Sequence, residues 1–196
     1  MKEIVIASNN AGKLREIKAI FLPLGFKGVA QSAFNVPEAE EPYPTFVENA
    51  LAKARNAAHF TGMPALADDS GICVNALQGA PGVLSARYAG EPKSDERNNQ
   101  KLVAALKEHD DRSAYYYAAL VLVRHAADPQ PLIAEGRWAG EVIAAPRGAN
   151  GFGYDPYFFL PDLGKTAAEL DAREKNLVSH RGKALRRLAA LITEQW

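Results

Sequence analysis

The sequence predicts a protein of the α/β class. Short apolar segments rich in β-branched residues, typical of buried strands, alternate along the chain with segments whose apolar residues have helical spacing. The composition is that of a soluble globular protein, with 47% apolar and 23% charged residues among 196. A chain of this length can form one substantial domain or two tightly joined lobes. Because we find no repeat, low-complexity tract or flexible linker, we expect residues 1–196 to form a single domain.

The N-terminal part predicts a strand, a helix and a second strand. Residues 3–7 are apolar and largely β-branched, and they precede the turn-forming residues Ser8–Asn10. The apolar positions of residues 11–21 have helical spacing, and Pro23 ends that helix. A second strand is expected near residues 28–31.

A second helix is predicted from Thr45 to about Phe60, because Thr45 and Glu48 have the spacing of a capping box. Its apolar stripe comprises Val47, Ala50, Leu51, Ala54, Ala57 and Ala58. Asn49, Lys53 and Asn56 follow one another at helical spacing and share a polar face. The later elements are expected as a strand, acidic turn and strand over residues 64–76, a helix with a polar outer face over 95–108, a hairpin of strands over 115–125 and 132–145, and a final helix over 175–193.

The charge and cysteine content argue against several classes of protein. Lys plus Arg and Asp plus Glu both number 23, so the net charge is zero, whereas general nucleic-acid and membrane-surface binders carry a basic excess. Cys73 is the single cysteine, so no internal disulfide can form, which suits a reducing cytoplasm. Lys2 and Glu3 interrupt any signal-like start, and no apolar run approaches the roughly 18 residues of a membrane span. We therefore expect a cytoplasmic protein.

Asp68 and Asp69 are adjacent carboxylates with apolar segments on both sides. Buried charges are costly unless they are paired, and Mg²⁺, a usual partner of carboxylates, commonly accompanies a phosphate. In an extended backbone the two side chains point to opposite faces, so one can ligate a metal or act as a base while the other braces a lysine or an amide. The alternative is an Asx-type turn between two strands. We favour a functional role, because two acids between apolar segments are a costly way to form a turn.

The segment after the first strand suits an anion. Free backbone N–H groups and the positive end of a helix dipole meet there. Ser8, Asn9 and Asn10 add side-chain donors, and Lys13 adds a cation. The same residues also suit a plain helix cap with Asn10 as N-cap, and the pattern alone leaves both interpretations open.

The proline-rich loop before the second helix carries Glu38, Glu40 and Glu41. Such a run of acids is most often a solvated surface. The functional alternative is that one of these carboxylates joins Asp68 or Asp69 around Mg²⁺.

Two segments in the C-terminal half could surround a ligand. In a glycine-rich loop, Phe152 and Tyr154 could stack on a flat base and Asp155 could accept a hydrogen bond from a ring N–H. An aromatic turn within the core is the alternative. Lys175 and the basic cluster over 179–183 lie near the start of the last helix, where cations are misplaced unless an anionic or carbonyl-bearing ligand is present.

In this order, these segments resemble the motifs of the Ham1/RdgB family, the inosine triphosphate pyrophosphatases. The matching segments are Ser8-Asn9-Asn10-Ala11-Gly12-Lys13, Thr45 to Ala54, Ala67 to Gly71, Gly79 to Gly82 with Ser85 to Tyr88, Gly151 to Pro156, and Ser179-His180-Arg181. The resemblance covers residues 4 to about 190. One such motif has little specificity, whereas the whole set in register is highly specific.

The resemblance implies an architecture and an activity. The fold would be a long mixed central sheet with flanking helices that form two lobes around a nucleotide cleft. The activity would be Mg²⁺-dependent hydrolysis of non-canonical purine nucleoside triphosphates (ITP, dITP, XTP) to the monophosphate and pyrophosphate, which cleanses the nucleotide pool. A homodimer is implied, with no nucleic-acid or membrane partner.

The resemblance also assigns roles to residues. Asp69 would be the proton acceptor and a Mg²⁺ ligand, with Asp68 as its neighbour. Lys13 and Lys53 would screen the charge of the leaving pyrophosphate. The triphosphate would lie on Ser8, Asn9, Asn10, Ala11, Gly12 and Lys13, Ser70 would contact the substrate, and Phe152, Gly153, Tyr154, Asp155, Lys175, His180 and Arg181 would surround the base and sugar.

The sequence offers three glutamates for the second metal ligand. Glu41 is the candidate, but the chain has Glu41-Pro42-Tyr43-Pro44 before Thr45-Phe46, where the family commonly has Glu-Thr-Gly before x-Thr-Phe, so that two prolines and a tyrosine replace a flexible glycine turn. The choice among Glu38, Glu40 and Glu41 therefore stays open.

Two other functions also remain open. One is a Maf-like pyrophosphatase that acts on pyrimidine or modified nucleotides, which a substrate panel distinguishes. The other is a nucleotide-binding module without catalysis, which substitution of Asp69 distinguishes.

Overall fold

Strands and helices alternate along the chain, as predicted for an α/β protein. A computed structural model describes residues 2–196 and contains a sheet of seven strands in the order β2-β1-β3-β4-β5-β6-β7. The strands are β1 Lys2–Ile6, β2 Phe26–Ala30, β3 Ala65–Val74, β4 Ser113–Val123, β5 Leu132–Val142, β6 Phe158–Leu160 and β7 Lys165–Thr166. The helices are α1 Ala11–Phe21, α2 Phe46–Thr61, α3 Asp95–Ala105, α4 Ala172–Val178 and α5 His180–Gln195. The sheet is mixed, because β1 pairs in parallel with β2 and β3 while β6 pairs antiparallel with β5 and β7.

The chain forms two compact units. The first unit contains the described residues up to Asp69, with Ala118–Gly136 and Arg181–Trp196. The second unit contains Ser70–Tyr117 and Arg137–His180. The strands β3, β4 and β5 each contribute residues to both units.

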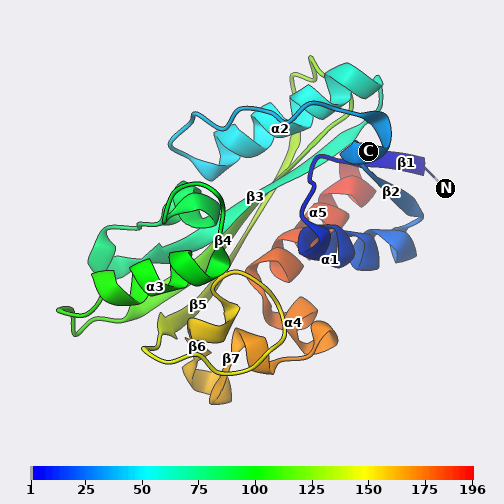
Figure 1. Cartoon of the computed structure of the whole chain (residues 1–196). Coiled ribbons are helices and arrows are strands. Elements are labelled where there is room, and N and C mark those ends of the chain that lie inside the picture. Colours follow the sequence, from blue (N-terminus) through cyan, green and yellow to red (C-terminus); the bar gives the residue numbers. More distant parts are fainter. Residues whose placement is uncertain (1) are drawn as a thin grey trace. The chain divides into compact units, whose positions relative to one another are not determined.

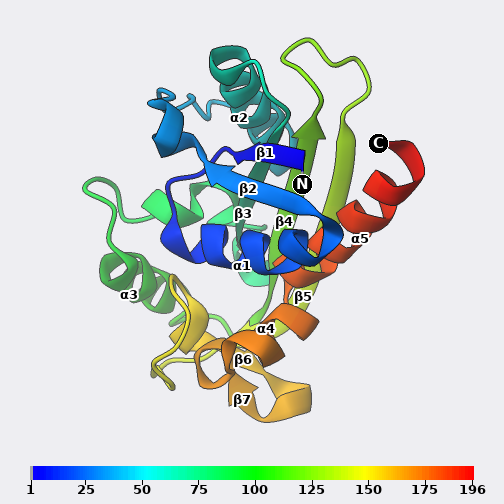
Figure 2. The same cartoon turned by 90° about the vertical axis from the view of Figure 1, so that its right-hand side faces the viewer.

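In the first unit, helices cover both faces of the strands (Figure 1). The alanine-rich stripe of α2 packs against Val5, Ala65 and Ala67 on one face, as its predicted apolar positions require. On the other face, α1 and α5 pack against Ile4, Ile6 and their neighbours. Figure 2 shows the parallel pair β1 and β2 with α2 above it and α1 below it. This arrangement is the usual one for parallel strands, whose faces are both buried.

Side-chain caps explain where α1 and α2 begin. The Oδ1 atom of Asn10 accepts a hydrogen bond from the backbone N–H of Lys13 at 3.0 Å, and α1 has the predicted bounds. The Thr45 hydroxyl oxygen accepts the N–H of Glu48 at 3.4 Å, and the Glu48 carboxylate accepts a hydrogen bond from the Thr45 hydroxyl. Both helices therefore start where the capping signals predict.

The second unit has its own core. Tyr116, Trp138 and Phe158, from β4, β5 and β6, form an aromatic cluster with ring centroids 4.6 to 6.3 Å apart. Leu102 and Leu106 pack against this cluster from α3 and the turn that follows it.

The structure corrects the acidic turn expected within residues 64–76. Residues Ala65–Val74 form one continuous strand, and Asp68 and Asp69 lie inside it. No turn is required, because the side chains of a strand alternate between its faces and each carboxylate meets a cation on its own side.

The expected single helix over residues 175–193 is also wrong. It is two helices, α4 and α5, separated at Ser179, whose backbone is extended with φ −68° and ψ 160°. The strands β6 and β7 carry no sequence signal that we recognised, because three and two residues are too few to show a periodic pattern.

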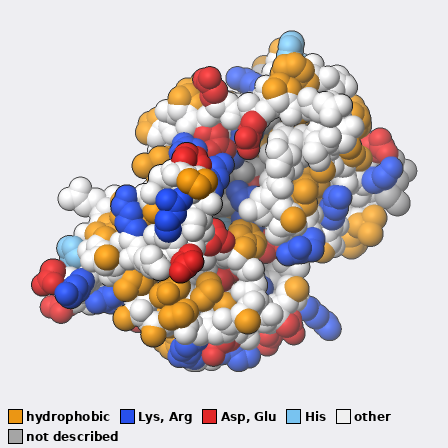
Figure 3. Space-filling model, in the orientation of Figure 1, with side chains coloured by type: hydrophobic (Ala, Val, Ile, Leu, Met, Phe, Trp, Pro, Cys, Tyr) orange, Lys and Arg blue, Asp and Glu red, His pale blue; other side chains and the backbone are white. Residues whose placement is uncertain are grey.

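On the face shown in Figure 3, lysine and arginine side chains lie among aspartate and glutamate side chains, in keeping with the balanced composition. None of the helices within residues 2–196 has the length and apolar character needed to cross a membrane.

Candidate active site

The alternation of β3 sends Asp68 and Asp69 to opposite faces of the first unit. Leu66 packs with the cluster of α1 and α5, and Ala67 packs with the cluster of α2. Asp68 lies two residues after Leu66 and therefore faces α1 and α5, and Asp69 lies two residues after Ala67 and therefore faces α2. Both carboxylates are buried, with exposures of 1% and 7%.

Asp68 is held by two cations. Its Oδ1 lies 2.7 Å from Lys13 Nζ on α1, and its Oδ2 accepts a hydrogen bond from Arg181 Nε on α5 at 2.6 Å. A second guanidinium nitrogen of Arg181 pairs with Glu16. Burial alone would raise the pKa of the Asp68 carboxyl, but Arg181 and Lys13 outweigh burial and hold that pKa well below its usual range. Asp68 is therefore an ionised brace between α1 and α5 at neutral pH.

Asp69 has a different environment. Its Oδ1 accepts a hydrogen bond from Lys53 Nζ on α2 at 2.8 Å, whereas its Oδ2 is buried and has no hydrogen-bond partner. Burial raises the pKa of the Asp69 carboxyl, and the nearby cations Lys53 and Lys13 offset this only in part. A carboxylate with a raised pKa and an available oxygen is suited to accept a proton or to ligate a metal.

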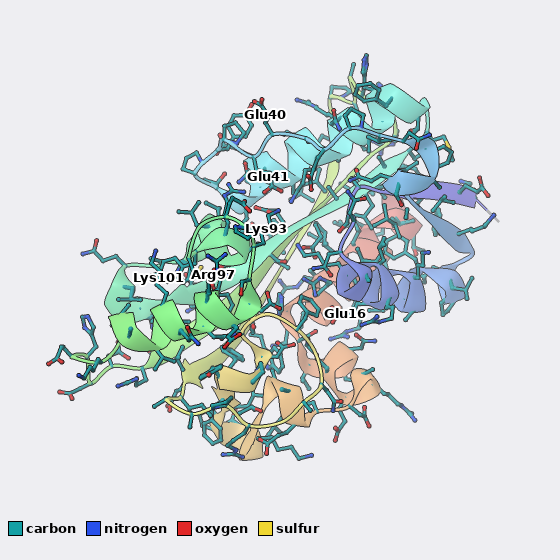
Figure 4. All side chains as sticks on the ribbon, viewed as in Figure 1. Glu16, Glu40, Glu41, Lys93, Arg97 and Lys101 are labelled. Atoms are coloured by element: carbon teal, nitrogen blue, oxygen red, sulfur yellow. The ribbon has the colours of Figure 1, made fainter. Side chains whose placement is uncertain are left out.

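Lys53 joins Asp69 to the acidic loop. Its Nζ lies 2.7 Å from Glu41 Oε1, and the Glu41 side chain is 26% exposed. Glu38 and Glu40 are exposed. Figure 4 shows Glu40 and Glu41 on the loop before α2. Of the three candidate glutamates, the structure brings Glu41 to Asp69, with Lys53 between the two carboxylates.

These two carboxylates fit a magnesium ion. Within residues 2–196 there is no ready cluster of three or more acidic, histidine or cysteine side chains that could hold a metal. Mg²⁺ does not require such a cage, since it commonly binds one or two carboxylates and completes its shell with water and substrate phosphates. The unpartnered Oδ2 of Asp69 and the carboxylate of Glu41 supply donors of the preferred kind.

We expect Lys53→Met to raise the pKa of Asp69 further. The Lys53 cation lowers that pKa against burial, and its removal also leaves Glu41 as an unscreened neighbouring charge. Carboxyl carbon NMR titration of the metal-free protein, labelled at aspartate, measures this directly. The parent should show Asp69 above the usual aspartate pKa, and Lys53→Met should show it higher still. A value for Asp69 that falls in the variant would contradict this electrostatic account.

The segment Ser8–Lys13 combines both interpretations left open by the sequence. Asn10 caps α1, and the Ser8 hydroxyl oxygen accepts a hydrogen bond from the Asn10 N–H at 3.1 Å. Burial lowers the pKa of Lys13, and Lys53 and Arg181 act in the same direction against Asp68. A bound anion beside Lys13 would stabilise its charged form. The capped helix start thus also has the charge and donors of a phosphate site.

In the second unit, the glycine-rich loop is anchored by a buried ion pair. Lys175 Nζ lies 2.6 Å from Asp155 Oδ2, which also accepts the N–H of Phe152 at 2.9 Å. The same ammonium lies 4.8 Å from the Phe152 ring centroid. Gly151 has φ +78°, and a Cβ there would collide with the Asp155 carboxylate. Asp155 and Lys175 therefore hold the loop and leave Phe152 partly exposed.

The stacking role expected of Tyr154 is not supported. Its ring is buried in the core of the second unit, and its hydroxyl donates to the Ser85 carbonyl at 2.7 Å. Burial raises the pKa of this hydroxyl. His180 is also buried, with its ring stacked on Tyr116 at 4.7 Å between centroids. Ser70 is half-buried on β3.

Gly153 is held by residues that the sequence did not lead us to predict. Asp95 Oδ2 accepts the Gly153 N–H at 2.7 Å, and Asn99 Nδ2 donates to the Gly153 carbonyl at 2.9 Å. Asn98 and Asn99 are buried on α3. Two adjacent asparagines inside a helix, where asparagine has low propensity, are the signal that could have pointed to them.

The motif order and this geometry agree with one known family. The model of the Ham1 family matches residues 4–191. The chain belongs to the Ham1 family. This confirms the resemblance inferred from the motifs.

Relatives in the Ham1 family cover nearly the whole chain. A protein of Nitrosomonas europaea named dITP/XTP pyrophosphatase is 66% identical over 194 residues, which is 99% of this chain and 96% of that protein. One of Aromatoleum aromaticum with the same name is 63% identical over 190 residues, 97% and 96% of the two chains. The solved structure of a Ham1 protein from Coxiella burnetii has a TM-score of 0.93 and 50% identity, and covers 99% of this chain and 100% of that one. The mixed α/β fold is therefore the Ham1 fold.

Proposed function

We propose that this protein hydrolyses non-canonical purine nucleoside triphosphates, including dITP, XTP and ITP, to the nucleoside monophosphate and pyrophosphate. The observation that carries the chemistry is Asp69, a buried carboxylate with a raised pKa and a free oxygen, held beside Lys53 and Glu41. The names of the relatives support the substrate class. The protein is thus an enzyme, a hydrolase of an acid anhydride bond.

In this proposal, Asp69 orients the attacking water and accepts its proton as the water attacks the α-phosphorus in line. The P–O bond to the β-phosphate breaks, and pyrophosphate leaves. Lys13 and Lys53 place positive charge near the leaving group, and the capped start of α1 offers backbone N–H groups to the triphosphate.

Asp69 and Glu41 would hold Mg²⁺. The chemistry that this ion supplies when bound is positive charge that offsets the phosphate oxygens and makes water more acidic. Lys53 pairs with both Glu41 and Asp69, and its positive charge reduces the repulsion between these two carboxylates when no metal ion is bound.

In the second unit, we propose Phe152 as the residue that stacks on the base, because it is partly exposed while Asp155 and Lys175 fix its loop. Selection of a 6-keto purine requires a donor to the 6-keto oxygen, since that donor would be left unpaired by the 6-amino group of adenine. We place this donor in the region of His180 and Arg181, which the resemblance puts around the base and sugar. The homodimer and the cytoplasmic location expected from the sequence also belong to this proposal.

A panel of nucleotides with a pyrophosphate readout tests the proposed substrate class. We expect kcat/KM for dITP, XTP and ITP to exceed that for dATP by about 100-fold or more, because the 6-amino group of adenine would leave the donor to the 6-keto oxygen unpaired. Faster turnover of UTP or TTP than of ITP would contradict the proposal. The comparisons give no support to a Maf-like enzyme, which would show that pyrimidine preference.

A further inference from the structure

Asn49 on α2 makes an unusual use of its side chain. It is the fourth residue of the helix and is 1% exposed. Its Oδ1 accepts a hydrogen bond from the Tyr43 N–H at 3.1 Å, and its Nδ2 donates to the Tyr43 carbonyl at 3.0 Å. One amide group thus satisfies both backbone groups of a single loop residue.

The loop around Tyr43 has few backbone donors. Pro42 and Pro44 have no N–H, so Tyr43 supplies the single backbone donor of residues 42–44. A residue before proline is restricted to extended conformations, and this applies to Glu41 as well as to Tyr43. The segment is therefore stiff, and a tie at Tyr43 constrains Glu41 two residues away.

The same face of α2 carries the partner of Glu41. Lys53 follows Asn49 by one helical turn and lies 2.7 Å from Glu41 and 2.8 Å from Asp69. Asn56 lies a further turn along and donates to the Pro37 carbonyl at 2.8 Å. Side chains of α2 thus contact the acidic loop at Pro37, Glu41 and Tyr43, and the Asn49 contact at Tyr43 lies two residues from Glu41.

We infer that Asn49 is a positioning residue for Glu41: its amide holds the stiff Pro42–Pro44 segment on α2 and thereby keeps the Glu41 carboxylate beside Asp69. The inference rests on the proposed role of Glu41 at the metal. Residues that orient metal ligands commonly change metal affinity by 10- to 100-fold when they are replaced. Asn49 therefore sets the affinity of the site for a divalent cation without touching the ion.

The test measures binding of Mn²⁺ to the full chain without nucleotide, by electron paramagnetic resonance of the free ion. Mn²⁺ takes carboxylate ligands as Mg²⁺ does. We expect Asn49→Ala to weaken binding about tenfold, and Glu41→Gln to weaken it at least as much. Asn98→Ala is the matched control. Asn98 is 2% exposed on α3, and its side chain also makes two hydrogen bonds to the backbone, accepting from the Ala89 N–H and donating to the Ala86 carbonyl. It should bind Mn²⁺ like the parent.

A second pair of variants tests the contact from the loop side. Tyr43 is 44% exposed, so Tyr43→Pro removes the donated hydrogen bond with little risk to the core, and Tyr43→Phe keeps both backbone groups. Tyr43→Pro should weaken Mn²⁺ binding in the same direction as Asn49→Ala, and Tyr43→Phe should not. Hydrogen exchange of residues 41–45 should be faster in Asn49→Ala and Tyr43→Pro than in the parent.

The outcomes separate this inference from the proposed function. If Asn49→Ala and Tyr43→Pro bind Mn²⁺ like the parent while Glu41→Gln is weaker, the inference is wrong and the metal role of Glu41 stands. An equal loss in Asn98→Ala would also overturn it, since the effect would then be general destabilisation. If Glu41→Gln itself binds normally, both the metal role and the inference are wrong. Release of pyrophosphate from dITP by the parent decides the hydrolytic function independently.

Discussion

Asp69→Asn should lower kcat for pyrophosphate release from dITP by about 10²- to 10⁴-fold, the range found when a general base is removed. The carboxamide keeps the shape of the side chain but cannot accept the proton of the attacking water. Lys53 keeps Glu41 as a partner, so the surrounding structure remains paired. The measurement is steady-state release of pyrophosphate at saturating Mg²⁺ and dITP.

The stability of the same variant provides the control. Because the pKa of Asp69 is raised in the folded protein, its ionised form is disfavoured by folding, and ionisation at neutral pH opposes stability. Asp69→Asn should therefore leave the free energy of unfolding unchanged or increase it. Unchanged turnover in this variant would mean that Asp69 is no base. Absent turnover in the parent would favour a binding module without catalysis.

Asp68→Asn, in contrast to Asp69→Asn, should lower the free energy of unfolding by about 3 to 5 kcal/mol, the usual cost of removing one partner of a buried ion pair. The change leaves the buried guanidinium of Arg181 and the Lys13 ammonium without their shared carboxylate. Urea unfolding of the parent and both aspartate variants at neutral pH measures the contrast. A loss below about 1 kcal/mol, typical of a surface pair, would show that Asp68 is not the brace described.

The effect of Asp68 should also depend on pH. Its folded pKa lies well below the value in the unfolded chain, so its stabilisation is complete above the unfolded pKa and is lost as the pH falls toward the folded pKa. The difference in unfolding free energy between the parent and Asp68→Asn should be constant from neutral pH to about pH 5 and shrink below about pH 4. A difference that grows on acidification would contradict the sign of this pKa shift.

Local signals predicted most of the elements of the first unit. Pro23 and the Asn10 cap determine where α1 ends and starts, and its observed bounds match the prediction. The apolar stripe of α2 is the face that packs on the sheet. The unpredicted strands β6 and β7 are held by pairing with β5 and with each other, a contact that local sequence does not record.

Sequence patterns predicted the different environments of the two aspartates but not the partner of each one. The unequal environments of Asp68 and Asp69 follow from strand alternation, which a sequence contains once the strand is recognised. The identity of each partner does not, because Arg181 and Asp68 are far apart in the chain and meet only when α5 packs on the sheet. Tyr154 is a second example: the sequence left a ligand contact and a core position open, and the packing of the second unit buries its ring.

Local pattern and motifs in register were enough to predict the α/β class and the Ham1 family, and to propose Asp68-Asp69 as the centre of the chemistry. The packed structure was needed to show that Asp68 is a brace, that Asp69 has an oxygen with no hydrogen-bond partner, and that Glu41 is the glutamate beside Asp69. The reason is that ionisation and access depend on burial and on distances of a few ångströms between separate elements. Those quantities arise when α1, α2 and α5 pack against β3, and no local segment contains them.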